Sequence, residues 1–92
     1  MSRKAADDLS SIYHYTFQQF GELQADTYLQ GLEEKFFELS ESSALAFTVD
    51  DIRPGYQRAL FQKHAIYFKE EKGYIFIVRV LHQQMKVTLH FS

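Results

Sequence analysis

Six residues in the second half of the sequence are the strongest candidates for contact with a partner. They are Arg53, Tyr56, Arg58, His64, Arg79 and His82. An arginine carries a planar fork of N–H donors that fits a carboxylate or a phosphate. Because a predicted hairpin brings their strands together, we expect these residues to form a cluster that binds a partner.

Arg79 is unusual because it interrupts an apolar row. Strict alternation along residues 74–82 predicts one row on each face of the strand: Ile75, Ile77, Arg79 and Leu81 on one, and Phe76, Val78, Val80 and His82 on the other. Arg79 then either anchors an acidic group of a partner or forms an internal ion pair with Asp50 or Asp51. The apolar residues of its row would need a cover, which favours a protein partner.

The sequence contains no recognisable catalytic motif. It lacks a glycine-rich phosphate loop, an HExxH motif and a nucleophile elbow. His82 and His90 are not at chelating spacing, and there is no cysteine. Asp50 and Asp51 fit a turn with an aspartate-to-backbone hydrogen bond and an arginine counter-ion better than they fit an acid–base pair. We therefore predict no catalytic residue, no metal site and no cofactor.

Two amphipathic helices are predicted in the first half of the chain. Apolar residues at helical spacing mark residues 3–20 and 22–39, with Ser2 as the N-cap of the first helix and Gly21 at its end. The short connection requires an antiparallel helical hairpin. Gly31 interrupts the second helix, so we expect the first helix or the sheet to approach it closely.

Three strands are predicted in the second half, at residues 56–61, 64–69 and 74–82. The last two form a hairpin with a loop of several residues around Gly73, and residues 44–49 are expected to be a loop or short turn. The fold class is therefore α+β, with the helical hairpin packed on one face of a three-stranded antiparallel sheet.

Composition and charge narrow the function classes. The 92 residues suit one domain, 1–92, and no apolar run is long enough for a membrane span. Net charge is −2, but residues 1–52 carry three basic against ten acidic side chains, and residues 53–92 carry seven against two. The basic half either meets an acidic partner or is simply solvated. The sequence pI near 6.0 disfavours a dedicated nucleic-acid binder, and we expect a cytoplasmic location.

Five motifs follow one another over essentially the whole chain: DDLxxIYxYTxxxFG ending at Gly21, QADxYLxGLE (24–33), DDIRPGYQR (50–58), KHAIYF (63–68) and VRVLHQQM (78–85). Together they resemble the ParE toxins of the ParE/RelE superfamily of type II toxin–antitoxin systems. The resemblance implies a helical hairpin on an antiparallel sheet and a role in plasmid stabilization. It also implies two partners, a ParD-like antitoxin and DNA gyrase with its A subunit as the contact, and no enzymatic activity.

The RelE branch of the superfamily offers an alternative, a ribosome-dependent mRNA endonuclease. At the strand positions that correspond to its basic catalytic residues this chain has His64 and Gln84, and its last six residues contain no tyrosine. A third possibility is a truncated, inactive toxin that only binds antitoxin. Family members usually begin with a short strand that would end near Met1, so a three-stranded sheet with an exposed edge is expected.

Overall fold

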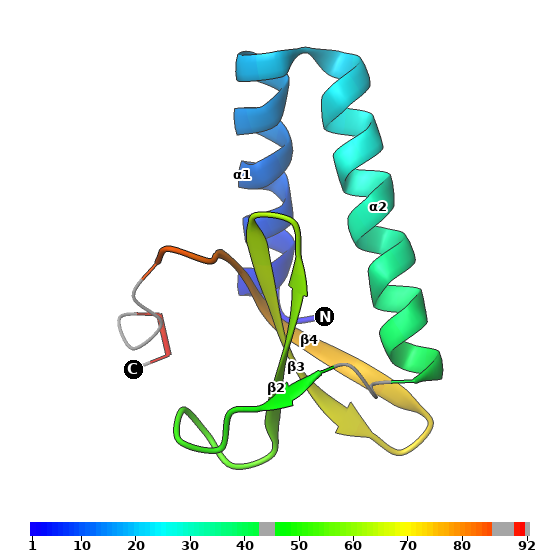
Figure 1. Cartoon of the computed structure of the whole chain (residues 1–92), viewed down its shortest axis with the longest axis vertical. Helices are drawn as coiled ribbons and strands as arrows, with labels where there is room; N and C mark the ends of the chain where they lie inside the picture. Colours follow the sequence, from blue (N-terminus) through cyan, green and yellow to red (C-terminus); the bar gives the residue numbers. More distant parts are fainter. Residues whose placement is uncertain (43–45, 86–89, 92) are drawn as a thin grey trace.

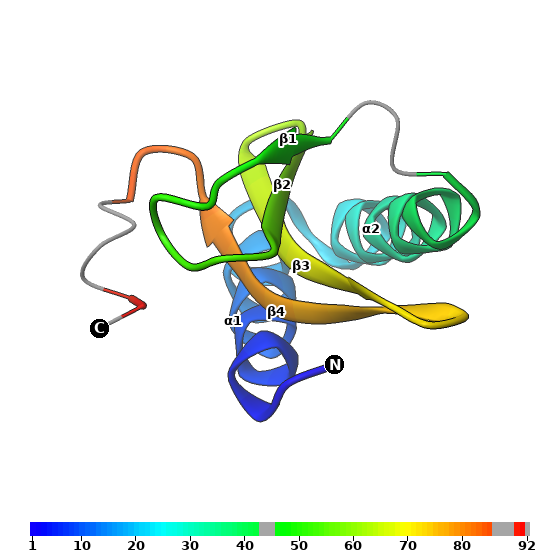
Figure 2. The same ribbon diagram turned by 90° about the horizontal axis from the view of Figure 1, so that it is seen from below.

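Two helices precede a four-stranded antiparallel sheet in the computed structural model, which describes residues 1–42, 46–85 and 90–91 (Figure 1). The elements are α1 (Arg3–Phe20), α2 (Glu22–Glu41), β1 (Phe47–Thr48), β2 (Tyr56–Phe61), β3 (His64–Glu71) and β4 (Tyr74–His82). The strands lie in sequence order, β1-β2-β3-β4. Figures 1 and 2 show the helices side by side against a twisted sheet, and the joined end of the helical hairpin projects beyond the sheet. The predicted α+β class is confirmed.

The helical hairpin begins and turns where the sequence predicts. The Ser2 hydroxyl accepts a hydrogen bond from the Ala5 backbone N–H at 3.0 Å, which caps α1. Gly21 adopts φ +93° and ψ 173°. The positive φ is one that glycine adopts without strain, but the extended ψ shows that the turn is not an αL cap. One glycine is therefore enough to reverse the chain.

Gly31 lies against the sheet rather than against α1. A Cβ atom built on Gly31 would lie 2.7 Å from Cζ of Phe61 in β2. No side chain larger than hydrogen fits there unless the Phe61 ring moves. The expected close approach is confirmed, and its partner is β2.

The main core lies between the helices and the sheet. Its members are contributed by both layers: Ala5, Leu32, Leu39, Ala59, Ile66, Phe68, Ile77 and Val80. Leu32, Ile66 and Phe68 are fully buried. Burying one such side chain contributes about 1.5–3 kcal/mol to folding, so this core holds the helical hairpin on the sheet.

A β-bulge breaks the alternation that the sequence predicts for β4. Tyr67 of β3 pairs with Arg79 and the next residue, Phe68, pairs with Ile77, which leaves Val78 as an extra residue. Ile77 and Val80 consequently both belong to the main core, whereas Leu81 belongs to a second cluster on the other face. The prediction that Ile75, Ile77, Arg79 and Leu81 form one row is wrong, because the bulge moves Arg79 and Leu81 to the face away from the helices.

Two further details of the sheet differ from the predictions. Phe47 and Thr48, expected in a loop or turn, pair with Arg58 and Gln57 as an edge strand, so the sheet has four strands instead of three. Part of that predicted loop, residues 44–45, lies outside the described residues. The β3–β4 hairpin has a loop of only two residues, in which Gly73 supplies a positive φ of 85°.

The outer edge of β4 is covered by the start of α1. The Ser2 backbone N–H donates to the Ile77 carbonyl at 2.9 Å, and the Ser2 hydroxyl donates to the Val78 carbonyl at 2.6 Å. The Val80 N–H donates to Oδ2 of Asp8 at 3.0 Å. These bonds give hydrogen-bond partners to backbone groups of β4 on both sides of the bulge. The edge that the sequence predicts as exposed is therefore covered here by Ser2 and Asp8.

No helix among the described residues is long and apolar enough to cross a membrane.

Candidate partner-binding face

The sheet divides the six predicted site residues between its two faces. Strand register places Tyr56, Arg58 and Arg79 with Tyr67 on the face away from the helices, which we call the open face. His64 and His82 pair with each other on the helix-facing side. Arg53 lies in the β1–β2 loop and reaches the backbone of Phe91. The predicted single cluster is therefore two separate groups.

Arg79 forms an internal ion pair with a residue of α1. Its Nε and Nη2 atoms donate to the two carboxylate oxygens of Asp8, each at 2.8 Å. Its Nη1 donates to the carbonyl of His90 at 3.2 Å. The hydrogen bond with Asp8 raises the pKa of Arg79, so the guanidinium stays charged. The ion-pair interpretation is confirmed, but Asp50 and Asp51 were the wrong partners.

Arg53 and Arg79 both hold the chain's own C-terminal residues on the open face. Nη2 of Arg53 donates to the Phe91 carbonyl at 2.9 Å. The Phe91 ring packs edge-on against the rings of Tyr56 and Tyr67, with centroids 5.8 and 5.1 Å away. Part of the open face is therefore covered by the chain itself.

Asp50 stabilises the turn before β2. Its Oδ1 accepts a hydrogen bond from the Gly55 N–H at 2.9 Å, as the sequence predicts. The nearby Arg53 bonds to Phe91 instead of acting as the expected counter-ion. Asp50 and Asp51 are both exposed in this loop, on the rim of the open face.

Arg58 differs from the other two arginines because its guanidinium makes no hydrogen bond to the described residues. Its Nε atom is buried and has no hydrogen-bond partner. Its guanidinium carbon lies 5.9 Å from the ring centroid of Tyr67, a cation–π contact that fixes the side chain on the open face. Among these three arginines, it is the one whose terminal nitrogens Nη1 and Nη2 make no hydrogen bond to the described residues and are not buried.

His64 and His82 lie in a hydrogen-bonded group with Tyr28 of α2. The Tyr28 hydroxyl oxygen is 2.6 Å from Nδ1 of His64, and the two imidazole rings are 5.5 Å apart in an edge-on contact. Burial is the main cause that lowers the pKa of His64, and the nearby His82 contributes. Burial also raises the pKa of Tyr28. A neutral imidazole can donate or accept at Nδ1, so the direction of the Tyr28–His64 hydrogen bond follows the His64 tautomer. Sequence spacing gave no sign of Tyr28, which lies 36 residues before His64.

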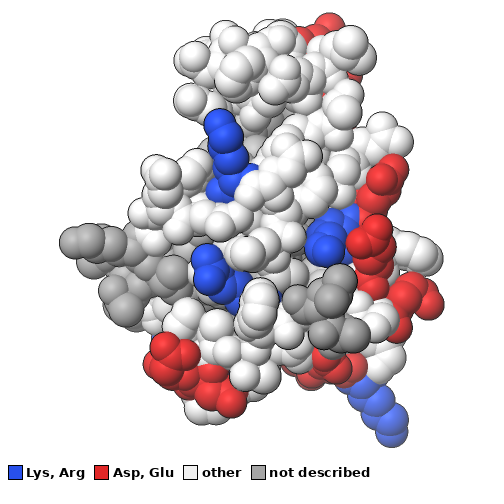
Figure 3. Space-filling view, in the orientation of Figure 1, with Lys and Arg blue, Asp and Glu red and all other residues white. Residues whose placement is uncertain are grey.

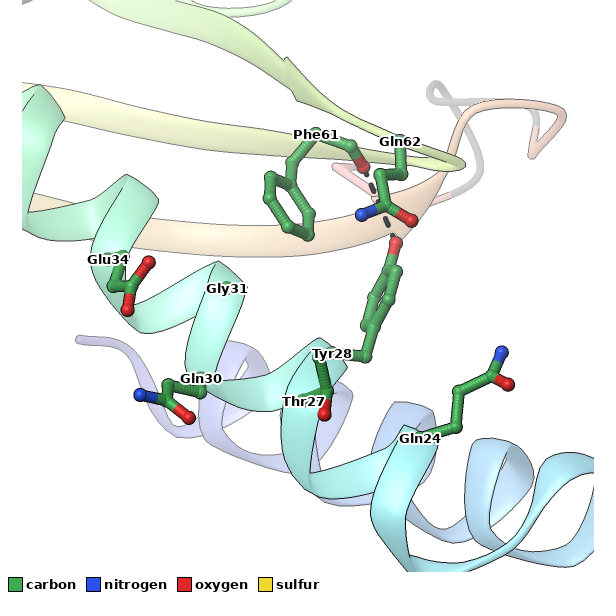
Figure 4. A pocket seen from close by; sticks show the side chains of 8 residues that line it. All are labelled: Gln24, Thr27, Tyr28, Gln30, Gly31, Glu34, Phe61 and Gln62. Carbon is green, nitrogen blue, oxygen red and sulfur yellow. Dashed lines mark hydrogen bonds between the residues drawn. The ribbon is translucent and has the colours of Figure 1, made fainter.

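A cavity of about 450 Å³ opens between α2 and the β2–β3 turn (Figure 4). Its lining is rich in amides and includes one carboxylate: Gln24, Thr27, Tyr28, Gln30, Gly31, Glu34, Phe61 and Gln62. Figure 4 shows Tyr28 reaching from α2 to the carbonyl of Phe61, which is 3.4 Å from its hydroxyl. Tyr28 joins this cavity to His64, and none of the six predicted site residues lines it.

Basic side chains are scattered on the face of the molecule seen in Figure 3. On this face the lysine and arginine side chains form separate patches rather than one continuous basic stripe. Such a stripe is the usual footprint of a protein that tracks a nucleic-acid backbone. Within the described residues there is also no group of three or more histidine, aspartate or glutamate side chains that could hold a metal ion.

Comparison with known proteins identifies relatives over nearly the whole chain. The family model described as "ParE toxin of type II toxin-antitoxin system, parDE" matches residues 1–87. A protein named Toxin ParE1 from Mycobacterium tuberculosis is 32% identical over 95% of this chain and 90% of its own length. Another Toxin ParE1, from Caulobacter vibrioides, is 30% identical over 100% of this chain and 95% of its own.

A solved structure shares the fold. A chain of the chromosomal ParDE TA system from P. aeruginosa superimposes with a TM-score of 0.74. The match covers 88% of this chain and 89% of the other, at 23% sequence identity. At that identity the likeness concerns the arrangement of helices and strands.

Proposed function

Because this chain belongs to the ParE toxin family of type II toxin–antitoxin systems, we propose that it inhibits DNA gyrase by protein–protein binding and that a ParD-type antitoxin neutralises it. The contact on gyrase is its A subunit. The toxin acts as one domain over residues 1–92, in the cytoplasm, where gyrase and DNA are found. Its biological role is plasmid stabilization.

The observation that carries this proposal is the open face. It presents the guanidinium of Arg58, which makes no hydrogen bond to the described residues, beside two exposed apolar side chains, Phe47 and Leu60. Arginine together with exposed aromatic and aliphatic groups is typical of protein-binding surfaces. The separate basic patches on the face seen in Figure 3 support a protein target over a nucleic-acid backbone.

A ParD-type antitoxin is supported by the structural neighbour, a chain of a ParDE toxin–antitoxin system. An acidic partner segment also suits the charge of residues 53–92, which carry seven basic and two acidic side chains. Opposite charge on toxin and antitoxin would speed their association.

The proposal is tested with purified gyrase in DNA supercoiling and DNA cleavage assays, with and without a ParD-type antitoxin. We expect this chain to block supercoiling and to accumulate cleaved DNA, and we expect antitoxin to restore supercoiling. A folded chain that leaves both activities unchanged contradicts the proposal.

A second candidate function, cleavage of mRNA in the ribosome, is favoured by one observation. The Tyr28 hydroxyl and the imidazole of His64 lie within hydrogen-bond distance, and the lowered pKa of His64 keeps this imidazole neutral, as a general base requires. His82 packs edge-on against His64 and leaves little room for a substrate between the rings. Cleavage of mRNA on translating ribosomes, lost in a His64→Asn variant, would support this function instead.

A further inference from the structure

The open face carries three arginines, two of which are satisfied within the chain. Arg79 binds Asp8 and the carbonyl of His90, and Arg53 binds the carbonyl of Phe91. Arg58 has only the ring of Tyr67, and its buried Nε lacks a hydrogen-bond partner. The buried Nε is out of reach of a partner, whereas Nη1 and Nη2 are not among the buried atoms, so these terminal nitrogens are the donors that a partner can contact.

The surroundings of Arg58 define the kind of group that fits. Phe47 is its cross-strand partner and is 59% exposed, and Leu60, two residues along β2 on the same face, is 41% exposed. The buried Tyr67 ring lies beside the guanidinium. We call Phe47, Arg58, Leu60 and Tyr67 the Arg58 patch. It combines the guanidinium of Arg58 with exposed apolar side chains across the strand pair, at Phe47, and along β2, at Leu60.

We propose that the Arg58 patch binds an aspartate or glutamate carried on an apolar segment of the antitoxin, with the carboxylate accepting from the terminal nitrogens Nη1 and Nη2 of Arg58. This inference rests on the proposed function and names the contact within it. A carboxylate matches the planar fork of arginine in a bidentate pair. The apolar side chains that flank this acidic residue in the antitoxin would pack against Phe47 and Leu60.

A protein segment fits the patch better than its alternatives. A nucleic-acid phosphate also matches an arginine fork, but Phe47 and Leu60 offer no charge to neighbouring phosphates. The exposed Asp50 and Asp51 in the adjoining β1–β2 loop would repel them. A second copy of this chain could supply a carboxylate from residues 1–52, with their ten acidic side chains, and the experiment below separates that case.

The experiment is a double-substitution cycle between Arg58 and the partner carboxylate. A ParD-type antitoxin that binds this chain is chosen first. Overlapping peptides that cover its sequence are then titrated by calorimetry against the wild-type protein and the Arg58→Gln variant. We expect one acidic, apolar peptide to bind the wild type. Replacing its Asp or Glu with Asn or Gln should weaken binding to the wild type by about tenfold or more and leave binding to Arg58→Gln unchanged.

Two control variants make the cycle specific. Arg58→Lys keeps the charge but loses the planar fork, so it should recover only part of the affinity. Lys72→Gln removes a positive charge from the β3–β4 loop, far along the sheet from the patch, and should leave affinity unchanged at moderate salt. Arg58→Gln should melt no lower than the wild type, because it removes a charge that lacks an internal hydrogen bond.

Several results would overturn the inference. An equal loss of affinity with wild type and Arg58→Gln would place the carboxylate elsewhere. Single-stranded oligonucleotide binding that Arg58→Gln abolishes would assign the patch to phosphate. A concentration-dependent dimer, seen by sedimentation and lost in Arg58→Gln, would assign it to a second copy. If the full antitoxin binds both proteins equally, this inference fails and the proposed function stands; if no ParD-type antitoxin binds the wild type, the proposed function fails as well.

Discussion

Asp8 and Arg79 lie 71 residues apart in the sequence and meet in a two-pronged ion pair with both oxygen–nitrogen distances at 2.8 Å. Their side chains are only 14% and 13% exposed. Asp8 also accepts the Val80 N–H next to the β-bulge. The carboxylate of Asp8 thus joins the start of α1 to the edge strand β4, and it occupies Arg79 in an internal contact.

The first prediction concerns this pair. Asp8→Asn should lower the free energy of unfolding by about 2–4 kcal/mol, since it leaves Arg79 without its charge partner in a mostly buried site. Urea denaturation measures this. Asp7→Asn, an exposed neighbour in the same helix, serves as control and should change stability by less than about 0.5 kcal/mol. Equal stability of the two variants would show that the pair does not hold α1 on β4.

The second prediction concerns pH. The pKa of His64 is lowered in the folded protein from an ordinary value of 6.5, so the unfolded chain binds more protons in that range. The stabilising contribution is therefore present above pH 6.5 and is lost as pH falls below it. Tyr28, His82 and Asp8 are the titratable groups that act on this imidazole.

Urea denaturation between pH 5 and pH 8 tests the pH prediction. The wild type should lose stability toward pH 5. His64→Asn keeps a group that can hydrogen-bond to Tyr28 but cannot titrate, so its stability should change less over the same range. Parallel curves for the two proteins would rule out His64 as the source of the pH dependence.

The third prediction concerns Gly31. Alanine is normally better than glycine in a helix by about 1 kcal/mol, but a Cβ here would lie 2.7 Å from Cζ of Phe61. Tyr28 packs edge-on against that ring, which limits its movement. Gly31→Ala should therefore destabilise the wild type by about 1 kcal/mol or more.

The same substitution in a Phe61→Ala background should instead be neutral or stabilising, because the clash is gone. The coupling between the two sites is read from the four unfolding free energies. If Gly31→Ala stabilises the wild type as well, the contact with Phe61 does not explain the glycine.

The fourth prediction concerns Ser2, whose hydroxyl both caps α1 and donates to the Val78 carbonyl. Ser2→Ala should cost about 1–2 kcal/mol of stability, at the upper end for an N-cap, because it loses both bonds. It should also speed amide hydrogen exchange at the start of α1. Ser11→Ala, exposed on the same helix, is the control. Unchanged exchange in Ser2→Ala would contradict the double role.

Local patterns in the sequence were sufficient to predict most of the fold. Apolar spacing gives α1 and α2, Gly21 marks their junction, and Asp50 with Gly55 marks the turn before β2. Each of these features depends on residues close together in the sequence. The two-residue strand β1 is too short to leave such a pattern, so its pairing with β2 appears only in the structure.

The candidate site was harder to predict because it depends on long-range contacts. The bulge at Val78 carries no glycine or proline that would mark it, yet it decides which face Arg79 occupies. The choice of Asp8 over Asp50 as the partner of Arg79, and of Tyr28 as the partner of His64, depends on how the helices pack on the sheet. The spacing of apolar residues along the sequence predicts neither the partner of Arg79 nor the partner of His64.

Inhibition of gyrase by binding is tested by the stoichiometry with which the purified toxin inhibits it. A fixed amount of gyrase is titrated with this chain, and residual supercoiling activity is measured. The gyrase concentration is set well above the dissociation constant. Inhibition should then rise in proportion to added toxin and become complete at about one toxin per gyrase binding site. Added antitoxin should restore the supercoiling activity. Undiminished supercoiling at a large excess of folded toxin would contradict the proposal that this chain inhibits gyrase.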